Sequence, residues 1–187
     1  MPEEANRRRS SGGSDGRVWT AGSDTSAPQP ERDSTIESMV AGRKLRQVDP
    51  IPRYQRDLTN QCGETIAGAQ AAKAASPRVA FNAAYSAMRL AVDAHMNAHG
   101  YRVESGEGGH AHRVRYAELA MTDILTTDDI AYYRASRQVR HRTEYPEPNE
   151  QAAVTASVAN EAIEVAKRFY AAVTNTLKPT RNKTTNE

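Results

Sequence analysis

The chain has very few of the residues that build disulfides, zinc ribbons or membrane spans. Cys62 is the single cysteine among 187 residues, so neither an intramolecular disulfide nor a Cys-x-x-Cys zinc site can form. No apolar run approaches the ~20 residues that a membrane-spanning helix needs. The arginines at 7–9 are followed by glycine, serine and aspartate instead of an apolar signal core. These absences predict a soluble, cytoplasmic protein.

The chain also has almost no excess of one sign of charge. Lysine and arginine number 25 against 23 aspartates and glutamates, a formal net charge of +2. Such a balance is too weak to draw nucleic acid to the whole surface, so an anion site must come from local clustering. Aromatic residues make up only 6% of the chain, and alanine dominates the apolar share after residue 65. This composition favours helices over sheets.

The front of the chain differs from the rest. Residues 1–52 are rich in Ser, Gly, Asp, Arg and Pro and follow neither a helical nor a strand period, which predicts a disordered tail. Within it, residues 35–46 are compatible with a short helix. The segment after Pro179, residues 179–187, is predicted to be a disordered C-terminus.

Residues 53–178 follow a helical period and are predicted to form one domain. Apolar residues recur there at steps of three and four. In the second expected helix they place Phe81, Tyr85, Met88, Val92 and Met96 on one face, predicted to be a core face. The expected helices run over about 54–75, 77–99, 110–124, 128–145 and from after Asn149 to 177. The fold class predicted is all-α, an up-and-down bundle of four to five helices.

Local signals support these boundaries. Ser76 and Pro77 are typical of a helix start, and Gly100 of the left-handed residue that ends one. Thr126 or Thr127 is expected to cap the fourth helix, and Asn149 the last. The glycine-rich stretch 101–109 is predicted to be a loop, and no strand pattern is visible.

The end of the fourth predicted helix concentrates side chains suited to an anion. Arg134, Arg137, His141 and Tyr145 are spaced to share one face at about 100° per residue, with Arg140 beside them. Guanidinium groups match phosphate oxygens, and an imidazole can move a proton near neutral pH. RNA or a nucleotide is therefore the predicted ligand.

Three segments resemble the HEPN superfamily (higher eukaryotes and prokaryotes nucleotide-binding). They are Ala98-His99-Gly100-Tyr101-Arg102, Gly108-Gly109-His110 and Arg140-His141-Arg142-Thr143-Glu144-Tyr145-Pro146. The last is similar to the Arg-Asn-x-x-Glu-Tyr segment of small actinobacterial HEPN proteins, and the resemblance covers about 54–177. It implies a four- or five-helix bundle that often dimerises through the helices bearing the motif. In many members it also implies a metal-independent ribonuclease, a toxin or defence factor, with an Arg-x(4–6)-His motif.

The resemblance implies roles for individual residues. Arg140, His141 and Tyr145 would be catalytic. The nucleic-acid contacts would be Arg134, Arg137, Arg142 and His110. In one alignment Arg140 is the motif arginine and Tyr145 occupies the histidine position, which favours binding without cleavage. In the other, Arg134 and His141 form Arg-x6-His, and His141 acts as acid or base. No metal or other cofactor is expected.

Two alternatives remain open. The chain is also compatible with a non-catalytic interaction or antitoxin-type module, in which Arg140 and Glu144 form an i, i+4 pair and Tyr145 packs on the bundle end. Under the toxin hypothesis, a homodimer and a nucleotidyltransferase-like antitoxin are the expected partners. A less favoured alternative is a zinc site built from four histidines, His95, His99, His110 and His112.

Overall fold

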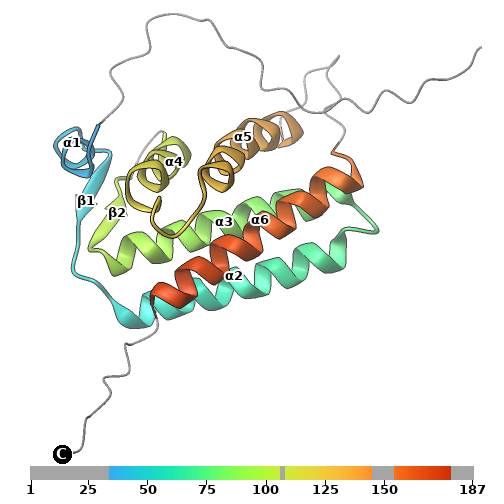
Figure 1. The fold of residues 1–187 in the computed structure, drawn as a ribbon, viewed down its shortest axis with the longest axis horizontal. Coiled ribbons are helices and arrows are strands. Elements are labelled where there is room, and N and C mark those ends of the chain that lie inside the picture. The colour runs from blue at the N-terminus through green and yellow to red at the C-terminus, as the bar shows by residue number, and fades with distance from the viewer. Residues whose placement is uncertain (1–33, 106–107, 145–153, 178–187) are drawn as a thin grey trace, which may run out of the picture. The chain divides into compact units, whose positions relative to one another are not determined.

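The computed structural model of the protein describes residues 34–105, 108–144 and 154–177, which belong to one compact unit. Figure 1 shows the helices and strands of these residues. In order they are α1 (Ile36–Ala41), β1 (Leu45–Gln47), α2 (Pro52–Ala72), α3 (Pro77–Ala98), β2 (Tyr101–Val103), α4 (Gly109–Ala120), α5 (Thr127–Glu144) and α6 (Ala156–Thr176). The predicted all-α bundle is confirmed.

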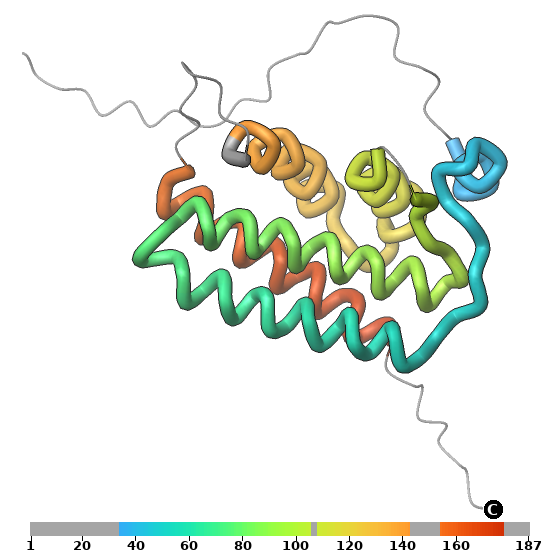
Figure 2. Tube along the Cα trace, turned by 180° about the vertical axis from the view of Figure 1, so that it is seen from behind, coloured from blue at the N-terminus to red at the C-terminus, as the bar shows by residue number. Residues whose placement is uncertain are grey.

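Helix α3 lies at the centre of the arrangement. It pairs with α2 as an antiparallel hairpin, and α6 packs against both helices. Helices α4 and α5 lie along the opposite side of α3 from α2, as both views show (Figures 1 and 2). None of the described helices combines the length and apolar character needed to cross a membrane.

The helix ends follow from capping. The Ser76 side chain accepts a hydrogen bond from the backbone N–H of Val79, and Pro77 occupies the first turn of α3. Beyond the other end of α3, Gly100 adopts φ +78°, where an added Cβ would meet the carbonyl oxygen of Val48 at 3.2 Å. A left-handed turn in such a tight space requires glycine. Both signals were predicted correctly.

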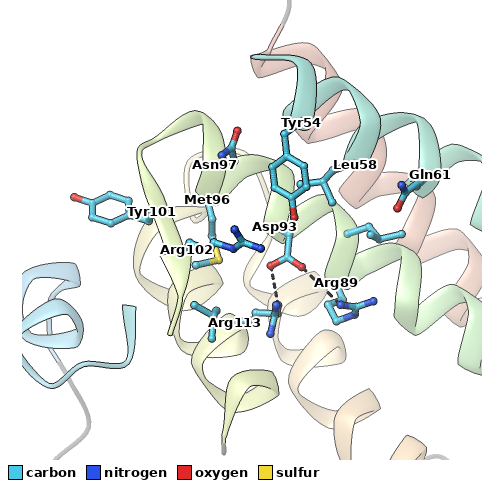
Figure 3. Close-up of a pocket in the computed structure, with 12 residues that line it drawn as sticks. Tyr54, Leu58, Gln61, Arg89, Asp93, Met96, Asn97, Tyr101, Arg102 and Arg113 are labelled. Atoms are coloured by element: carbon cyan, nitrogen blue, oxygen red, sulfur yellow. Dashed lines mark hydrogen bonds and ion pairs between the residues drawn. The ribbon is translucent and has the colours of Figure 1, made fainter. Parts of the chain in front are cut away.

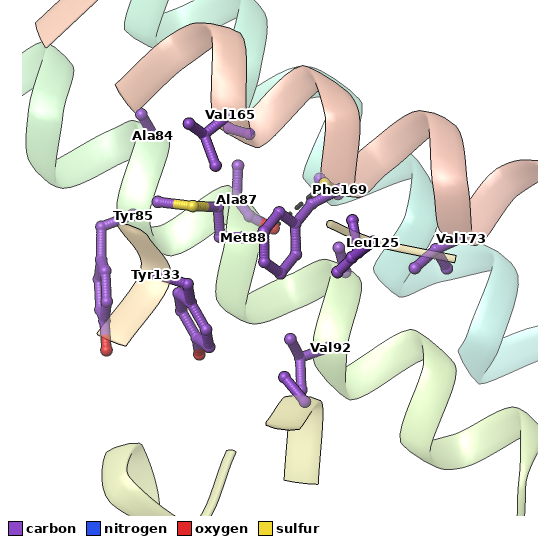
Figure 4. Packing of buried hydrophobic residues seen from close by; sticks show 14 of the residues in the cluster. Ala84, Tyr85, Ala87, Met88, Val92, Leu125, Tyr133, Val165, Phe169 and Val173 are labelled. Atoms are coloured by element: carbon purple, nitrogen blue, oxygen red, sulfur yellow. Dashed lines mark hydrogen bonds between the residues drawn. The ribbon is translucent and has the colours of Figure 1, made fainter. Parts of the chain in front are cut away.

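The core forms around one face of α3. Its large side chains are buried where the helical period predicted: Phe81, Tyr85, Met88, Val92 and Met96. Tyr133 from α5 packs between Tyr85 and Phe169 of α6, with ring centroids 5.6 and 5.4 Å away (Figure 4). Burying each such side chain contributes roughly 1.5–3 kcal/mol, so α3, α5 and α6 are held by a shared aromatic centre.

The predicted tail extended too far, since residues 34–52 are part of the fold. Helix α1 buries Met39 completely, and β1 buries Leu45 to 1% exposure. Strand β1 pairs antiparallel with β2, in the stretch predicted as loop, with Leu45 opposite Val103. Three-residue strands are too short to show an alternating pattern, and their pairing joins segments distant in sequence.

Other boundaries also differ from the predictions. Helix α4 ends at Ala120, four residues early, and a turn then buries Met121 and Leu125. Helix α6 begins at Ala156 with Thr155 as its N-cap, so Asn149 is not the cap. Residues 1–33, 145–153 and 178–187, including Tyr145, lie outside the described residues.

Candidate functional site

The charged end of α5 meets α3 and the first turn of α4. Arg140 lies on the same side of α5 as the buried residues Tyr133 and Ser136, so it points inward and is only half-exposed. Its Nη1 atom lies 3.5 Å from Nε2 of His110. Its guanidinium carbon lies 5.3 Å from the centroid of the Tyr85 ring, within the range of a cation–π interaction.

His110 contacts both Tyr85 and Arg140. Its Nδ1 atom lies 3.0 Å from the Tyr85 hydroxyl. A guanidinium can only donate, so its contact with Nε2 favours the tautomer in which Nε2 accepts and Nδ1–H donates to Tyr85. We call these three residues the Tyr85–His110–Arg140 cluster.

The electrostatics of the cluster keep both of its titratable groups neutral near pH 7. Burial lowers the pKa of His110, and the nearby positive charges lower it further, Arg140 most and then Arg113, Arg89 and Arg137. Burial raises the pKa of Tyr85, although arginines oppose that shift. His110 is therefore a neutral imidazole, and Tyr85 a neutral phenol, within a positive field.

The first turn of α4 holds His110 in position beside Tyr85. Gly108 adopts φ +81° just before the helix. Arg113 then donates from Nη1 to the carbonyl oxygen of Gly109 at 3.0 Å and from Nε to Asp93 on α3 at 2.7 Å. These bonds tie the first turn of α4 to α3, so the imidazole is held beside Tyr85.

The structure brings together only part of the predicted site. Arg140 and His110 are in contact, and Arg137 is close enough to influence the pKa of His110. His141 and Arg142 are exposed and lie about 100° and about 200° round the helix from Arg140. They are therefore not part of the cluster.

Arg134 is engaged elsewhere. Its Nε donates to Glu118 Oε1 of α4 at 2.6 Å, and the other carboxylate oxygen of Glu118 accepts from Arg115. This half-exposed arginine links α5 to α4 instead of facing the cluster. The predicted stripe of Arg134, Arg137 and His141 is exposed along its length, and the Arg134 guanidinium within it is held by Glu118.

Sequence reasoning missed three residues of α3. Tyr85 was assigned only to the core, and Arg89 and Asp93 were not singled out. They follow at i, i+4 and i+8, a polar stripe beside the apolar one. A tyrosine in a core face also usually needs a partner for its hydroxyl, and this signal could have pointed to a neighbouring polar site.

The cluster offers one acceptor nitrogen, one phenol and several guanidinium groups, a set suited to phosphate. Among the described residues, no three His, Cys, Asp or Glu side chains gather as metal ligands. His95 and His99 stack at 4.2 Å, while His110 contacts Tyr85 instead. The resemblance to the HEPN superfamily stays a prediction. No protein-family model, curated protein or solved structure matches the chain.

Proposed function

We propose that the protein engages RNA or a nucleotide at the Tyr85–His110–Arg140 cluster. The observation that carries the proposal is a neutral imidazole held 3.5 Å from a guanidinium nitrogen and 3.0 Å from a phenol oxygen. Further positive charge comes from Arg137 and Arg89, which act on the pKa of His110. Phosphate oxygens are the acceptors that such guanidinium groups match best.

The same residues support metal-independent RNA cleavage. On binding, Arg140 would turn from His110 toward the phosphate and leave Nε2 unoccupied. Nε2 would take the proton of a 2′-hydroxyl whose oxygen then bonds to phosphorus, while the bond to the 5′-oxygen breaks and that oxygen takes a proton from water. Arg140 and Arg137 would stabilise the charge that develops on the phosphate. His110 replaces His141 as the proposed base.

A non-catalytic interaction module is the second candidate. Both ring nitrogens of His110 already contact protein groups, an arrangement that also suits a purely structural imidazole. In that case the cluster stabilises the junction of α3, α4 and α5, and α5 serves as the surface for a partner.

RNA binding and cleavage distinguish these functions. We would measure the anisotropy of a labelled single-stranded RNA with the full chain in EDTA at several salt concentrations, and cleavage on gels. Arg140→Gln should weaken binding about tenfold and reduce the salt slope by about 1. His110→Gln should retain binding and lose cleavage. Arg78→Gln, at an exposed arginine in the first turn of α3, is the matched control.

Each outcome assigns one function. Binding without cleavage in the wild type would leave an RNA-binding module. No binding by the wild type at low salt would exclude RNA as the ligand and leave the interaction module.

The proposed biological role is that of a toxin or defence factor. Such a protein would act as a homodimer and be neutralised by a nucleotidyltransferase-like antitoxin. Inducible expression should then arrest growth in the wild type and not in His110→Gln, and sedimentation should give a dimer mass. Growth unaffected by the wild type would contradict this role.

A further inference from the structure

A cavity of about 310 Å³ lies next to the cluster, between α2, α3, β2 and α4. Asp93 lies two turns along α3 from Tyr85. Figure 3 shows the polar side chains that converge on this space, among them Tyr54, Arg89, Arg102 and Arg113 around Asp93. The function proposed above assigns no phosphate contact to any of these residues.

The lining carries more positive than negative charge. Asp93 Oδ1 accepts from Arg113 Nε at 2.7 Å, and Oδ2 lies 3.8 Å from Arg89 Nη1. Arg102 supplies a third guanidinium to the lining, which contains one carboxylate. Three cations against one anion leave an excess of two charges. The exposed fractions of the Asp93, Arg113 and Arg89 side chains are 16%, 20% and 32%, so water screens these three charges only in part. Arg102 is an exposed residue at the edge of the cavity.

A second observation strengthens the charge argument. Arg102 lies directly opposite Arg46 in the ladder of β1 and β2. Residues directly opposite in an antiparallel pair project from the same face, and like charges there are destabilising. An anion bound near Arg102 would relieve this repulsion.

The cavity also offers an aromatic surface. The Arg102 guanidinium carbon lies 5.7 Å from the centroid of the Tyr54 ring, and Tyr54 is 37% exposed. Leu58, Leu90 and Met96 contribute apolar side chains to the lining. A planar ring can stack against a tyrosine or a guanidinium, as nucleobases do in single-strand binding sites.

We propose that this cavity binds a phosphate monoester attached to a planar ring, as in a nucleoside monophosphate. A monoester near pH 7 carries a charge close to −2, which matches the excess of two positive charges. A phosphodiester carries one negative charge and leaves half of the excess in place. The ring lies against Tyr54 and Arg102, and the phosphate reaches the free donors of Arg89 and Arg113. The ligand is a free nucleotide or the phosphorylated end of an RNA.

Titration calorimetry on the full chain tests the proposal. The probes are 5′-AMP, adenosine, inorganic phosphate, and a short RNA with either a 5′-phosphate or a 5′-hydroxyl. We expect 5′-AMP to bind at least tenfold more tightly than adenosine or inorganic phosphate. Its affinity should fall below pH ~6, where the monoester gains a proton. Preference for the 5′-phosphorylated RNA over 5′-AMP would identify an RNA end as the ligand, and the reverse a free nucleotide.

Variants locate the site. Arg102→Gln should weaken 5′-AMP binding about tenfold. Tyr54→Leu should lower the affinity for 5′-AMP to that for inorganic phosphate. Arg78→Gln should leave both affinities unchanged, and thermal unfolding checks that each variant is folded. No 5′-AMP binding at millimolar concentration, equal affinity for inorganic phosphate, or an unaffected Arg102→Gln variant would overturn the proposal.

This inference does not depend on the proposed function of the Tyr85–His110–Arg140 cluster. Arg140→Gln should reduce RNA anisotropy and leave 5′-AMP calorimetry unchanged. Arg102→Gln should weaken 5′-AMP binding and leave the anisotropy of a 5′-hydroxyl RNA unchanged. Each proposal can therefore fail without the other.

Discussion

The Tyr85 hydroxyl and Nδ1 of His110 lie 3.0 Å apart, so a hydrogen bond joins the middle of α3 to the first turn of α4. Tyr85 is fully buried, while His110 is half-buried at the rim of the cluster. The bond therefore connects the aromatic centre of the bundle directly to the group that we propose for chemistry.

Removing the Tyr85 hydroxyl should destabilise the protein modestly. Tyr85→Phe keeps the ring stacked on Tyr133 and loses the hydrogen bond of the hydroxyl to His110, which should lower the free energy of unfolding by about 1 kcal/mol. Urea denaturation would measure this as a lower midpoint with an unchanged slope. Tyr170→Phe, a half-buried tyrosine of α6, is the matched control. Equal losses in both variants would show that the bond contributes nothing specific.

The pKa of His110 should respond to Arg140. It should lie below the ordinary value of about 6.5, and Arg140→Gln should raise it because Arg140 is the largest charge contribution after burial. NMR titration of the imidazole nitrogens measures both values. Because the folded-state pKa is the lower one, His110 stabilises the fold above about pH 6.5 and loses that contribution as the pH falls. An unchanged pKa in Arg140→Gln, or a shift in Arg78→Gln, would contradict the assignment.

His95 should make the fold sensitive to acid. It is 3% exposed, its Nδ1 lies 3.0 Å from the Tyr116 hydroxyl, and burial, with His99 beside it, lowers its pKa to about 4. The unfolded chain binds the proton first, so stability is present above pH ~6.5 and about 3 kcal/mol is lost on going down to pH 4.

Replacement by glutamine isolates this effect. His95→Gln keeps an acceptor for Tyr116 and does not titrate, so its free energy of unfolding should fall less between pH 7 and pH 4 than that of the wild type. Urea denaturation at both values measures the difference, with the exposed His141→Gln as control. The same pH dependence in His95→Gln and the wild type would exclude His95 as the cause.

The docking of α1 should be measurable through Met39. This side chain is completely buried, and Met39→Ala should cost about 2–4 kcal/mol through lost burial and a residual cavity. Ile51→Ala, at a position that is 54% exposed, should cost less than about 1 kcal/mol. Thermal or urea unfolding compares them. A loss for Met39→Ala no larger than for Ile51→Ala would show that α1 detaches readily.

Most of the fold could be predicted because helices carry their signals locally. The apolar period of α3, the Ser76 cap and the Gly100 turn depend on neighbours within a few residues, and all three were read correctly. The β1–β2 pairing and the docking of Met39 depend on segments far apart in the chain. A period along one segment contains no information about such contacts.

The candidate site was predicted in part for a related reason. Arg140 and His110 were both named, but their contact was not, since it joins two helices. The helical wheel grouped Arg134 with Arg137 and His141 as one face. It could not tell that the neighbouring side, bearing Arg140, is the one turned inward toward α3.

The short ribbon of β1 and β2 has a consequence for the order of assembly. A brief connection joins α2 to α3, so their hairpin closes a small loop at low entropic cost, whereas the ribbon must bring together residues distant in sequence. We therefore expect α2 and α3 to associate early and α1 with β1 to dock late. Because β2 contributes Arg102 and Val103 to the cavity lining, the cavity that we propose for a nucleotide would be completed in the final steps of folding.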